Sequence, residues 1–487
     1  MLKLYRRLAR TTLFLCLVAA STRAQTAPAA TPQSGAQDAT AATSEPSAPT
    51  VPVTLFPHSD STRWLLSGQA NIIFQAHPGF HSPYSGPNSL LARGEYKTSM
   101  VGTLYMGYQL IANPRYNLDA IYDEESAGGR GVSEALGLAG FTNLDVVRNP
   151  SLGPIPYLAR VQLHQTLGLT DKLVDSPRTQ FSLATKVPER RIDLRFGKMG
   201  LPDILDLNNP GSDSHLQFLN WTVDNNGAWD YAADTRGYTY AAIVEYDDAD
   251  FSARYALALM PTIANGIDLQ WNLHRASGQN VELEYRKTPF AFLPEHLLDP
   301  KRKGTVRLLG FVNHANMGDY RDQIKLARPT SAKPDITNHP LQSTRKYGLG
   351  LNFEQELTSD LRVFGRFGWN EGQHESYAYT EVDQTFELGG DYAGNFWGRP
   401  NDKFGVVGVS NAIKRDHQNY LAAGGLGFLL GDGALSYARE DILETYYTAH
   451  NWRGLFTSFD AQLIAHPGYN NARGPVEMFS VRTHVDF

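Results

Sequence analysis

The chain closes with VEMFSVRTHVDF, residues 476–487, in which apolar and polar side chains alternate. A period of two residues is the signature of a β-strand, because successive side chains point to opposite faces. One face would carry Phe479, Val481, Thr483, Val485 and Phe487, and the other Ser480, Arg482, His484 and Asp486. The stretch therefore predicts a final strand with one apolar face and one charged face, which reaches the last residue.

The same pattern recurs from Trp64 onward, in segments separated by clusters of Gly, Pro, Asn and Asp. Seventeen segments have it: 64–76, 98–110, 116–124, 158–168, 179–187, 191–199, 237–247, 251–260, 279–287, 304–314, 345–356, 359–370, 383–394, 403–412, 434–447, 452–465 and 475–487. A bacterial single-chain barrel has an even number of strands, so we expect about 16, with 18 as the alternative.

The first 60 residues differ from the rest. Residues 1–24 combine basic residues, the short apolar run TLFLCLVAA and small residues before Gln25, which is typical of a signal peptide. Residues 25–60 are rich in Ala, Pro, Thr and Ser and predict a disordered linker. The only cysteine, Cys16, lies in the signal, so we expect a mature chain without disulfides, cysteine-bound zinc or a cysteine nucleophile.

Charge and hydropathy exclude two classes of protein. Removing residues 1–24, which hold five basic residues and no acid, shifts the formal charge from −6 to −11. A nucleic-acid-binding protein would have the opposite balance. After the signal no run approaches the roughly 18 apolar residues of a transmembrane helix.

Two architectures produce alternating strands, a soluble sandwich and a membrane barrel. The strands are too many for one sandwich, no linker divides them after Trp64, and an aromatic residue stands at the C-terminus. Closure also gives the last strand a partner, whereas an open sheet leaves its edges unpaired. We therefore predict an all-β fold, a transmembrane antiparallel β-barrel over residues 61–487. Its apolar face would contact lipid and its polar face would line a lumen.

Polar side chains on the inward face are the candidates for contact with a solute. Arginine, carboxylate and amide groups supply the donors and acceptors that a hydroxyl-rich solute needs. The alternative for each residue is a charge pair that only hydrates and stiffens the lumen. The candidates are Arg160, Gln162, Arg191, Asp193, Arg195, Asn352, Glu354, Arg362, Arg366 and Arg482.

Trp221, Trp229 and Trp397 lie in loop-like segments. They are candidates for an aromatic platform on which a sugar ring stacks, or alternatively for the aromatic girdle at the membrane interface. We assign Tyr238 and Tyr240 to the girdle. Residues 131–139 predict a short helix, and the long segment 200–235 predicts a functional loop.

Eight stretches together resemble the carbohydrate-selective porin family of outer membranes, and they span residues 67–487. They are SGQANIIFQAHPGFHSPYSGPNSL, ESAGGRGVSEALGLAGFTN, PYLARVQLHQTLGL, LQFLNWTVDNNGAWDYAADTRGYTY, LLGFVNHANMGDY, WGRPNDKFGVVGVSN, YLAAGGLGFLLGDG and HPGYNNARGPVEMFSVRTHVDF. The resemblance implies a barrel of about 16 strands in the outer membrane that passes mono- or oligosaccharides by diffusion. It favours a monomer over a trimer, with sugars and membrane lipid as partners and no nucleic acid.

Other functions remain as alternatives. A general porin would have the same lumen charges, and a polysaccharide-export barrel would need a strongly basic lumen. For an enzyme, the cluster Asp123, Glu124 and Glu125 lacks a second carboxylate at a recognisable separation, and His164, Ser182 and Ser252 form no known motif. We expect no catalysis, no metal site and no cofactor. The alternative is Ca²⁺ at the acidic loop or at Asp224, Asp230 and Asp234.

Overall fold

A computed structural model describes residues 53–146, 152–287, 290, 293–294, 298–299 and 301–487. The predicted signal peptide and residues 25–52 of the predicted linker lie outside the described residues.

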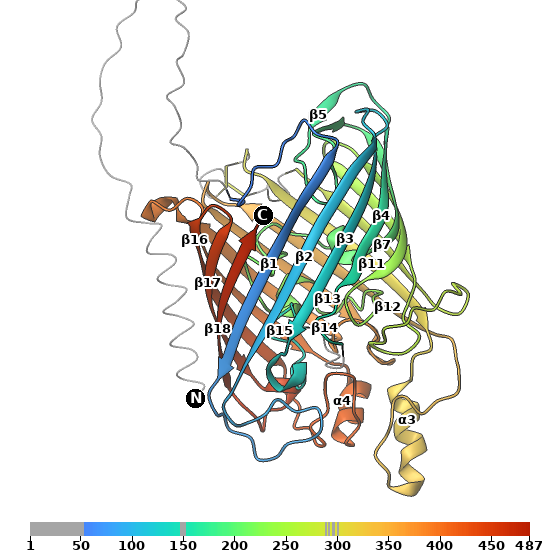
Figure 1. Ribbon diagram of the computed structural model, residues 1–487. Helices are drawn as coiled ribbons and strands as arrows, with labels where there is room; N and C mark the ends of the chain where they lie inside the picture. Colours follow the sequence, from blue (N-terminus) through green and yellow to red (C-terminus); the bar gives the residue numbers. More distant parts are fainter. Residues whose placement is uncertain (1–52, 147–151, 288–289, 291–292, 295–297, 300) are drawn as a thin grey trace, which may run out of the picture. The chain divides into compact units, whose positions relative to one another are not determined.

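Sixteen antiparallel strands form a closed barrel, in which each strand pairs with the barrel strands before and after it and the last strand pairs with the first (Figure 1). The barrel strands are β1 (Trp64–His77), β2 (Glu95–Ile111), β3 (Leu118–Gly129), β4 (Tyr157–Gly168), β7 (Arg191–Met199), β8 (Thr239–Asp247), β9 (Phe251–Ala258), β10 (Ser277–Tyr285), β11 (Gly304–Ala315), β12 (Thr344–Glu356), β13 (Leu361–Asn370), β14 (Gln384–Ala393), β15 (Lys403–Ala412), β16 (Glu440–Trp452), β17 (Leu455–Ala465) and β18 (Val476–Asp486). The predicted fold and strand number are thus confirmed.

The last strand closes the barrel on the first. β18 pairs with β1 from Gln69 opposite Asp486 to Ala76 opposite Phe479. The backbone of Phe487 continues this ladder, since its N–H and carbonyl both bond Gly68. Val481 and Phe479 face outward and Arg482 faces the lumen, as the terminal alternation predicts.

One predicted barrel strand, 179–187, is wrong. Most of this segment lies between β5 (Leu173–Asp175) and β6 (Lys186–Pro188), two short strands that pair with each other and not with the barrel. The apolar residues between them alternate as in a strand, but they form the tip of a hairpin. Removing this segment from the seventeen candidates leaves the sixteen strands of the barrel.

The two ends of the barrel differ. Connections as short as 248–250 and 453–454 join the strands at one end, which we call the turn end. Connections as long as 200–238 and 413–439 join them at the other, which we call the loop end. The short helices are η1 (Val132–Ala135), η2 (Leu201–Asp203), α2 (Trp221–Asp224), α3 (Tyr320–Ala327), η3 (Arg328–Thr330), η4 (Gly394–Trp397), α4 (Arg415–Ala422) and η5 (Pro467–Tyr469).

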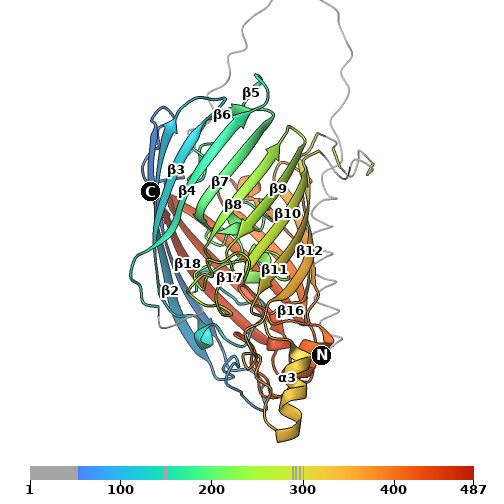
Figure 2. The same cartoon turned by 90° about the vertical axis from the view of Figure 1, so that its right-hand side faces the viewer.

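Figure 2 shows α3 at the loop end and the β5–β6 hairpin at the turn end. The helix predicted at 131–139 is only the single turn η1, whose Ser133 and Glu134 have left-handed backbone angles. Among the described residues, no helix is both long enough and apolar enough to cross a membrane.

The barrel is apolar outside and polar inside. Outward side chains of the wall, such as Phe196, Leu308 and Phe459, are more than half exposed. Inward side chains such as Glu282 and Asn313 are fully buried. A water-soluble protein has the reverse arrangement, because apolar side chains gather in its core. This polarity is that of a barrel whose outer face contacts hydrocarbon.

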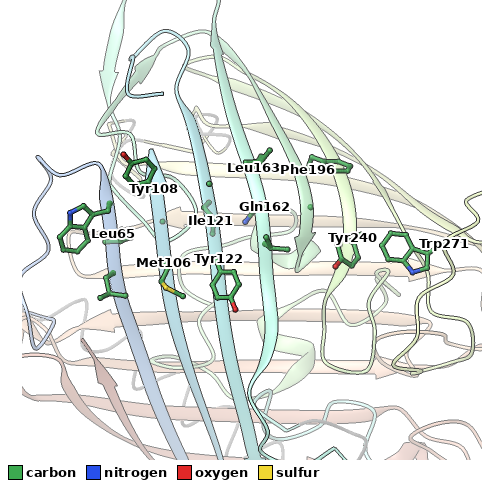
Figure 3. A pocket seen from close by; sticks show the side chains of 16 residues that line it. Leu65, Met106, Tyr108, Ile121, Tyr122, Gln162, Leu163, Phe196, Tyr240 and Trp271 are labelled. Carbon is green, nitrogen blue, oxygen red and sulfur yellow. The ribbon is translucent and has the colours of Figure 1, made fainter. Parts of the chain in front are cut away.

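A shallow apolar groove of 820 Å³ crosses the outer face over β1–β4, β7 and β8 (Figure 3). Its lining includes Trp64, Met106, Tyr108, Tyr122, Phe196 and Trp271. The groove belongs to the apolar outer surface of the wall.

A charged side chain on the closing strand β18 should reduce the stability of the barrel only where it lies on the outer face. We expect Val481→Arg to lower the free energy of unfolding by about 2–4 kcal/mol, because it places a guanidinium in hydrocarbon. Val481→Leu, which keeps the apolar contact, serves as the control. Urea unfolding of the barrel refolded in bilayers measures both, and equal stability of the two variants would contradict the outward placement of this residue.

Candidate functional site

The connection between β7 and β8, residues 200–238, folds into the lumen, and we call it the inner loop. Its side chains bury an apolar cluster of their own, in which Phe218 packs against Phe364 of the wall and Trp221 packs against Phe141. Asn220 caps α2 by accepting a hydrogen bond from the backbone N–H of Thr222. The segment predicted as a functional loop is therefore a packed structure that fills part of the lumen.

Arg366 on β13 holds the inner loop most extensively. Its guanidinium lies 2.9 Å from Asp206 of the inner loop and 2.8 Å from Glu387 on β14. It also donates hydrogen bonds to the carbonyls of Val223 and Asp224, at 2.5 and 3.1 Å. The side chain is fully buried, so its charge is offset by these partners and not by water.

Other predicted lumen residues also bind the inner loop. Asn352 donates to the carbonyl of Asp206 at 2.7 Å, and Glu354 accepts from the backbone N–H of Asn209 at 2.8 Å. Arg482 on β18 donates to the carbonyl of Gln217 at 2.8 Å. The inward direction of these side chains agrees with the sequence pattern. They hold the inner loop against the wall.

Arg160 on β4 connects the wall to the start of the inner loop. Its Nε lies 2.7 Å from Asp203, and Nη1 lies 3.4 Å from Asp123 on β3. The guanidinium carbon is 4.9 Å from the ring centroid of Phe181 and 5.1 Å from that of Tyr238, so it contacts both rings. Four parts of the chain meet at this one cation.

The remaining candidates lie on the wall nearer the turn end. Arg191 pairs with Asp193 at 2.6 Å, and Asp193 also contacts His164 at 2.9 Å. Arg195 donates to the carbonyl of Phe181 at 2.9 Å.

Arg362 pairs with Asp391 on β14, and Gln162 points inward and is buried. Of the predicted cations, Arg160, Arg191, Arg195 and Arg362 are partly exposed, whereas Arg366 and Arg482 are fully buried.

Further charged side chains, which the sequence analysis missed, continue the row of paired arginines and carboxylates along the inner wall. Arg254 on β9 contacts Glu245, Glu282 and Glu284 at 2.7–2.8 Å. Arg307 on β11 joins Glu284 to Glu354 at 2.9 and 3.1 Å. The alternation in residues 277–285, with Asn280, Glu282 and Glu284 on one face, carries the signal that would have found them.

The predicted aromatic platform is wrong for Trp221 and Trp229. Trp221 and Trp229 are 7 % and 1 % exposed, with their indole N–H groups bonded to Asn143 and Asn280, so neither offers a free ring face. Trp397 stacks on the outward Tyr392 at the turn end, which fits the girdle alternative. Tyr240 faces outward as expected. Tyr238 does not belong to the girdle, because it faces the lumen and donates a hydrogen bond to Glu125.

The polar clusters considered for metal or catalysis have other partners. Asp230 accepts from the backbone N–H groups of Tyr377 and Ala378, and Asp123 faces Arg160. Within the described part of the chain, no group of three or more His, Cys, Asp or Glu side chains is arranged to hold a metal ion. Calcium at these carboxylates stays an untested prediction. His164 faces Asp193 and Asp119 and not a serine.

At the loop end, His417 of α4 contacts two other connections between strands. Its imidazole lies 3.4 Å from Asp383 and 3.7 Å from Glu381, and it stacks on Tyr320 of α3 with ring centroids 4.2 Å apart. Burial alone would lower the pKa of His417. The hydrogen bonds and charges of Asp383 and Glu381 outweigh burial and raise that pKa above its usual 6.5.

Comparison with known proteins connects this geometry to a family. The family model described as carbohydrate-selective porin, OprB family, matches residues 117–487. Among solved structures, the high-pH structure of Pseudomonas putida OprB is 14% identical, with a TM-score of 0.62, and the match covers 87% of this chain and 94% of that one. The low-pH structure of the same protein is 13% identical, with a TM-score of 0.44 and coverage of 87% and 92%. No curated protein matches in sequence.

We expect Arg366→Ala to lower the free energy of unfolding by about 3–5 kcal/mol, because it leaves the buried carboxylates Asp206 and Glu387 without their cation. Arg345→Ala, which removes an exposed arginine of β12, should have little effect. Denaturant unfolding measures both. A stability loss for Arg366→Ala no larger than that for Arg345→Ala would show that the inner loop does not depend on this contact.

The loop-end contacts should weaken at high pH. A histidine whose pKa is raised in the folded state contributes stability that is complete below 6.5 and is lost as the pH rises through the raised value. Trypsin should therefore cleave after Lys414 and Arg415 faster at pH 9 than at pH 6.5, after correction for the pH dependence of trypsin itself. His417→Gln should abolish that difference. An equal pH response in both proteins would refute the role of His417.

Proposed function

We propose that this chain, which belongs to the carbohydrate-selective porin, OprB, family, passes mono- or oligosaccharides by passive diffusion through the lumen of a single barrel. The family and the fold indicate a channel and not an enzyme, and they imply the outer membrane. In such barrels the short turns face the periplasm and the long loops face outward. The turn end would thus be periplasmic and α3 and α4 would be external.

The observation that carries this proposal is the row of paired cations and carboxylates on the inner wall. Arg191, Arg254, Arg307 and Arg362 each contact at least one carboxylate, so donors and acceptors alternate around the lumen. A sugar hydroxyl is both donor and acceptor and can exchange one such contact for the next. Because each of these four arginines already has a carboxylate partner, binding at each step stays weak enough for the solute to leave.

The candidate residues divide into two roles. We assign Arg160, Arg191, Arg195 and Arg362 to the solute path, because they are partly exposed on the wall. Asp193 and Gln162 are buried beside them and orient or support that wall. Asn352, Glu354, Arg366 and Arg482 set the width of the passage through their contacts with the inner loop.

Export of an anionic polymer would need a strongly basic lumen. The inner wall does not favour this function, because carboxylates accompany its arginines. A general porin would share the row, so only the relative permeation of matched solutes separates it from a sugar-selective channel. Swelling of liposomes that contain the purified protein measures this for glucose, maltose and an amino acid of glucose size.

We expect glucose to permeate faster than the amino acid, and Arg362→Ala to reduce that preference about two- to tenfold, the equivalent of a hydrogen bond worth about 0.5–1.5 kcal/mol. Lys287→Ala is the control, since Lys287 is exposed and its ion pair with Asp250 lies in the connections near the turn end. Rates that follow solute size alone, in the unaltered protein, would contradict sugar selectivity. Absence of any swelling would contradict the channel itself.

A further inference from the structure

The connection between β4 and β7, residues 169–190, is the one turn-end connection that forms a sheet of its own among the described residues. Its strand β5 lies at the turn end in Figure 1, and Figure 2 shows β5 and β6 there together. Between them lies a ten-residue segment, 176–185, which we call the insert tip. Other turn-end connections, such as 248–250 and 453–454, join their strands with two or three residues, so the length and position of this connection ask for a separate explanation.

The insert tip folds back into the lumen. Leu183 is 1 % exposed and packs with Leu65 and Ile121, both inward residues of the wall. Its backbone N–H donates to the buried carboxylate of Asp119 at 2.9 Å. A Cβ added to Gly107 would lie 2.8 Å from the Leu183 side chain, so the tip rests directly on the inner surface of β2.

The insert tip is also fixed from the outside. Arg178 donates hydrogen bonds at 2.7–3.1 Å to the backbone carbonyls of Ser59, Thr62 and Trp64, the chain that leads into β1. The turn at the apex is closed by paired backbone bonds between Thr179 and Ser182. These contacts hold the tip against the barrel at several points, so it is a fixed part of the turn-end mouth.

Phe181 brings the insert tip to the solute path. Its ring is partly exposed and lies under the guanidinium of Arg160, and its carbonyl accepts from Arg195 at 2.9 Å. Arg160 in turn contacts Asp203 of the inner loop at 2.7 Å. The inner loop from one end and the insert tip from the other therefore meet at the same cation.

We propose that the insert tip is a second constriction at the turn end, in which Phe181 limits the length of the saccharide that passes. An aromatic face favours the C–H face of a sugar ring, while Arg160 and Arg195 beside it donate to ring hydroxyls. A single ring can pass this position by exchanging contacts, whereas a longer chain must align each successive ring. This inference rests on the proposed sugar channel, and it assigns a function to the turn end, through which the sugar would leave the barrel.

Liposome swelling with glucose, maltose and maltotriose tests the role of the ring. We expect Phe181→Ala to raise the swelling rate for maltotriose relative to that for glucose several-fold and to increase single-channel conductance. Leu173→Ala is the matched control, because this exposed residue of β5 lies on the insert but away from its tip. Retained barrel folding is checked by the heat-dependent mobility of each variant in gels.

Arg178→Ala tests the position of the tip without touching the ring. We expect larger fluctuations of the open-channel current, since the tip loses its bonds to residues 59–64, and a partial return in Arg178→Lys. Lys172→Ala, at an exposed residue of the same insert, should behave as the unaltered protein. Folded Phe181→Ala and Arg178→Ala proteins that match the controls, in a channel that passes glucose, would overturn this inference alone. A wild-type barrel that passes no glucose would overturn the proposed function and this inference with it.

Discussion

The pairing of the last strand with the first is the constraint on which the rest of the structure depends. In hydrocarbon every backbone N–H and carbonyl must find its partner within the protein, and only a closed sheet leaves no edge. β18 meets this demand down to Phe487, which bonds Gly68 of β1. Closure then gives the wall two faces of fixed character, an apolar one toward lipid and a polar one toward the lumen.

The polar inner face creates a second requirement, because charges removed from water need partners. Arg366 and Arg482 find these partners among the carbonyls and carboxylates of the inner loop. The contacts that stabilise the two buried charges therefore also hold the loop in the lumen. Nearer the turn end, Arg254 and Arg307 find carboxylates on neighbouring strands and stay on the wall. The lumen therefore has a part filled by the inner loop and a part in which the arginines pair with carboxylates of the wall, and we propose the latter as the path of a hydroxyl-rich solute.

The sequence predicted the barrel because strand periodicity is local, and segments such as 455–465 and 361–370 show it without any knowledge of the fold. It failed at 179–187, where Phe181, Leu183 and Val187 alternate as in a strand but Leu183 turns into the lumen to pack on Leu65. The inward direction of Arg160 and Arg366 was predictable from period two, whereas their partners on the inner loop were not. Trp221, Trp229 and Tyr238 were misplaced for the same reason, since the course of a long loop depends on distant contacts.

The central claim is that the inner loop stays fixed against the wall while sugar passes beside it. Cysteine crosslinking tests this directly, because the only native cysteine, Cys16, lies in the predicted signal peptide. A Cβ placed on Gly278 of β10 would lie 2.9 Å from the Cβ of Ala232 in the inner loop, so these two residues can be replaced by a cysteine pair. The account predicts that oxidation crosslinks the pair in the folded barrel and leaves glucose-driven liposome swelling equal to that of either single variant. Failure to crosslink, or a crosslink that stops swelling, would show that the loop must move and would contradict the account.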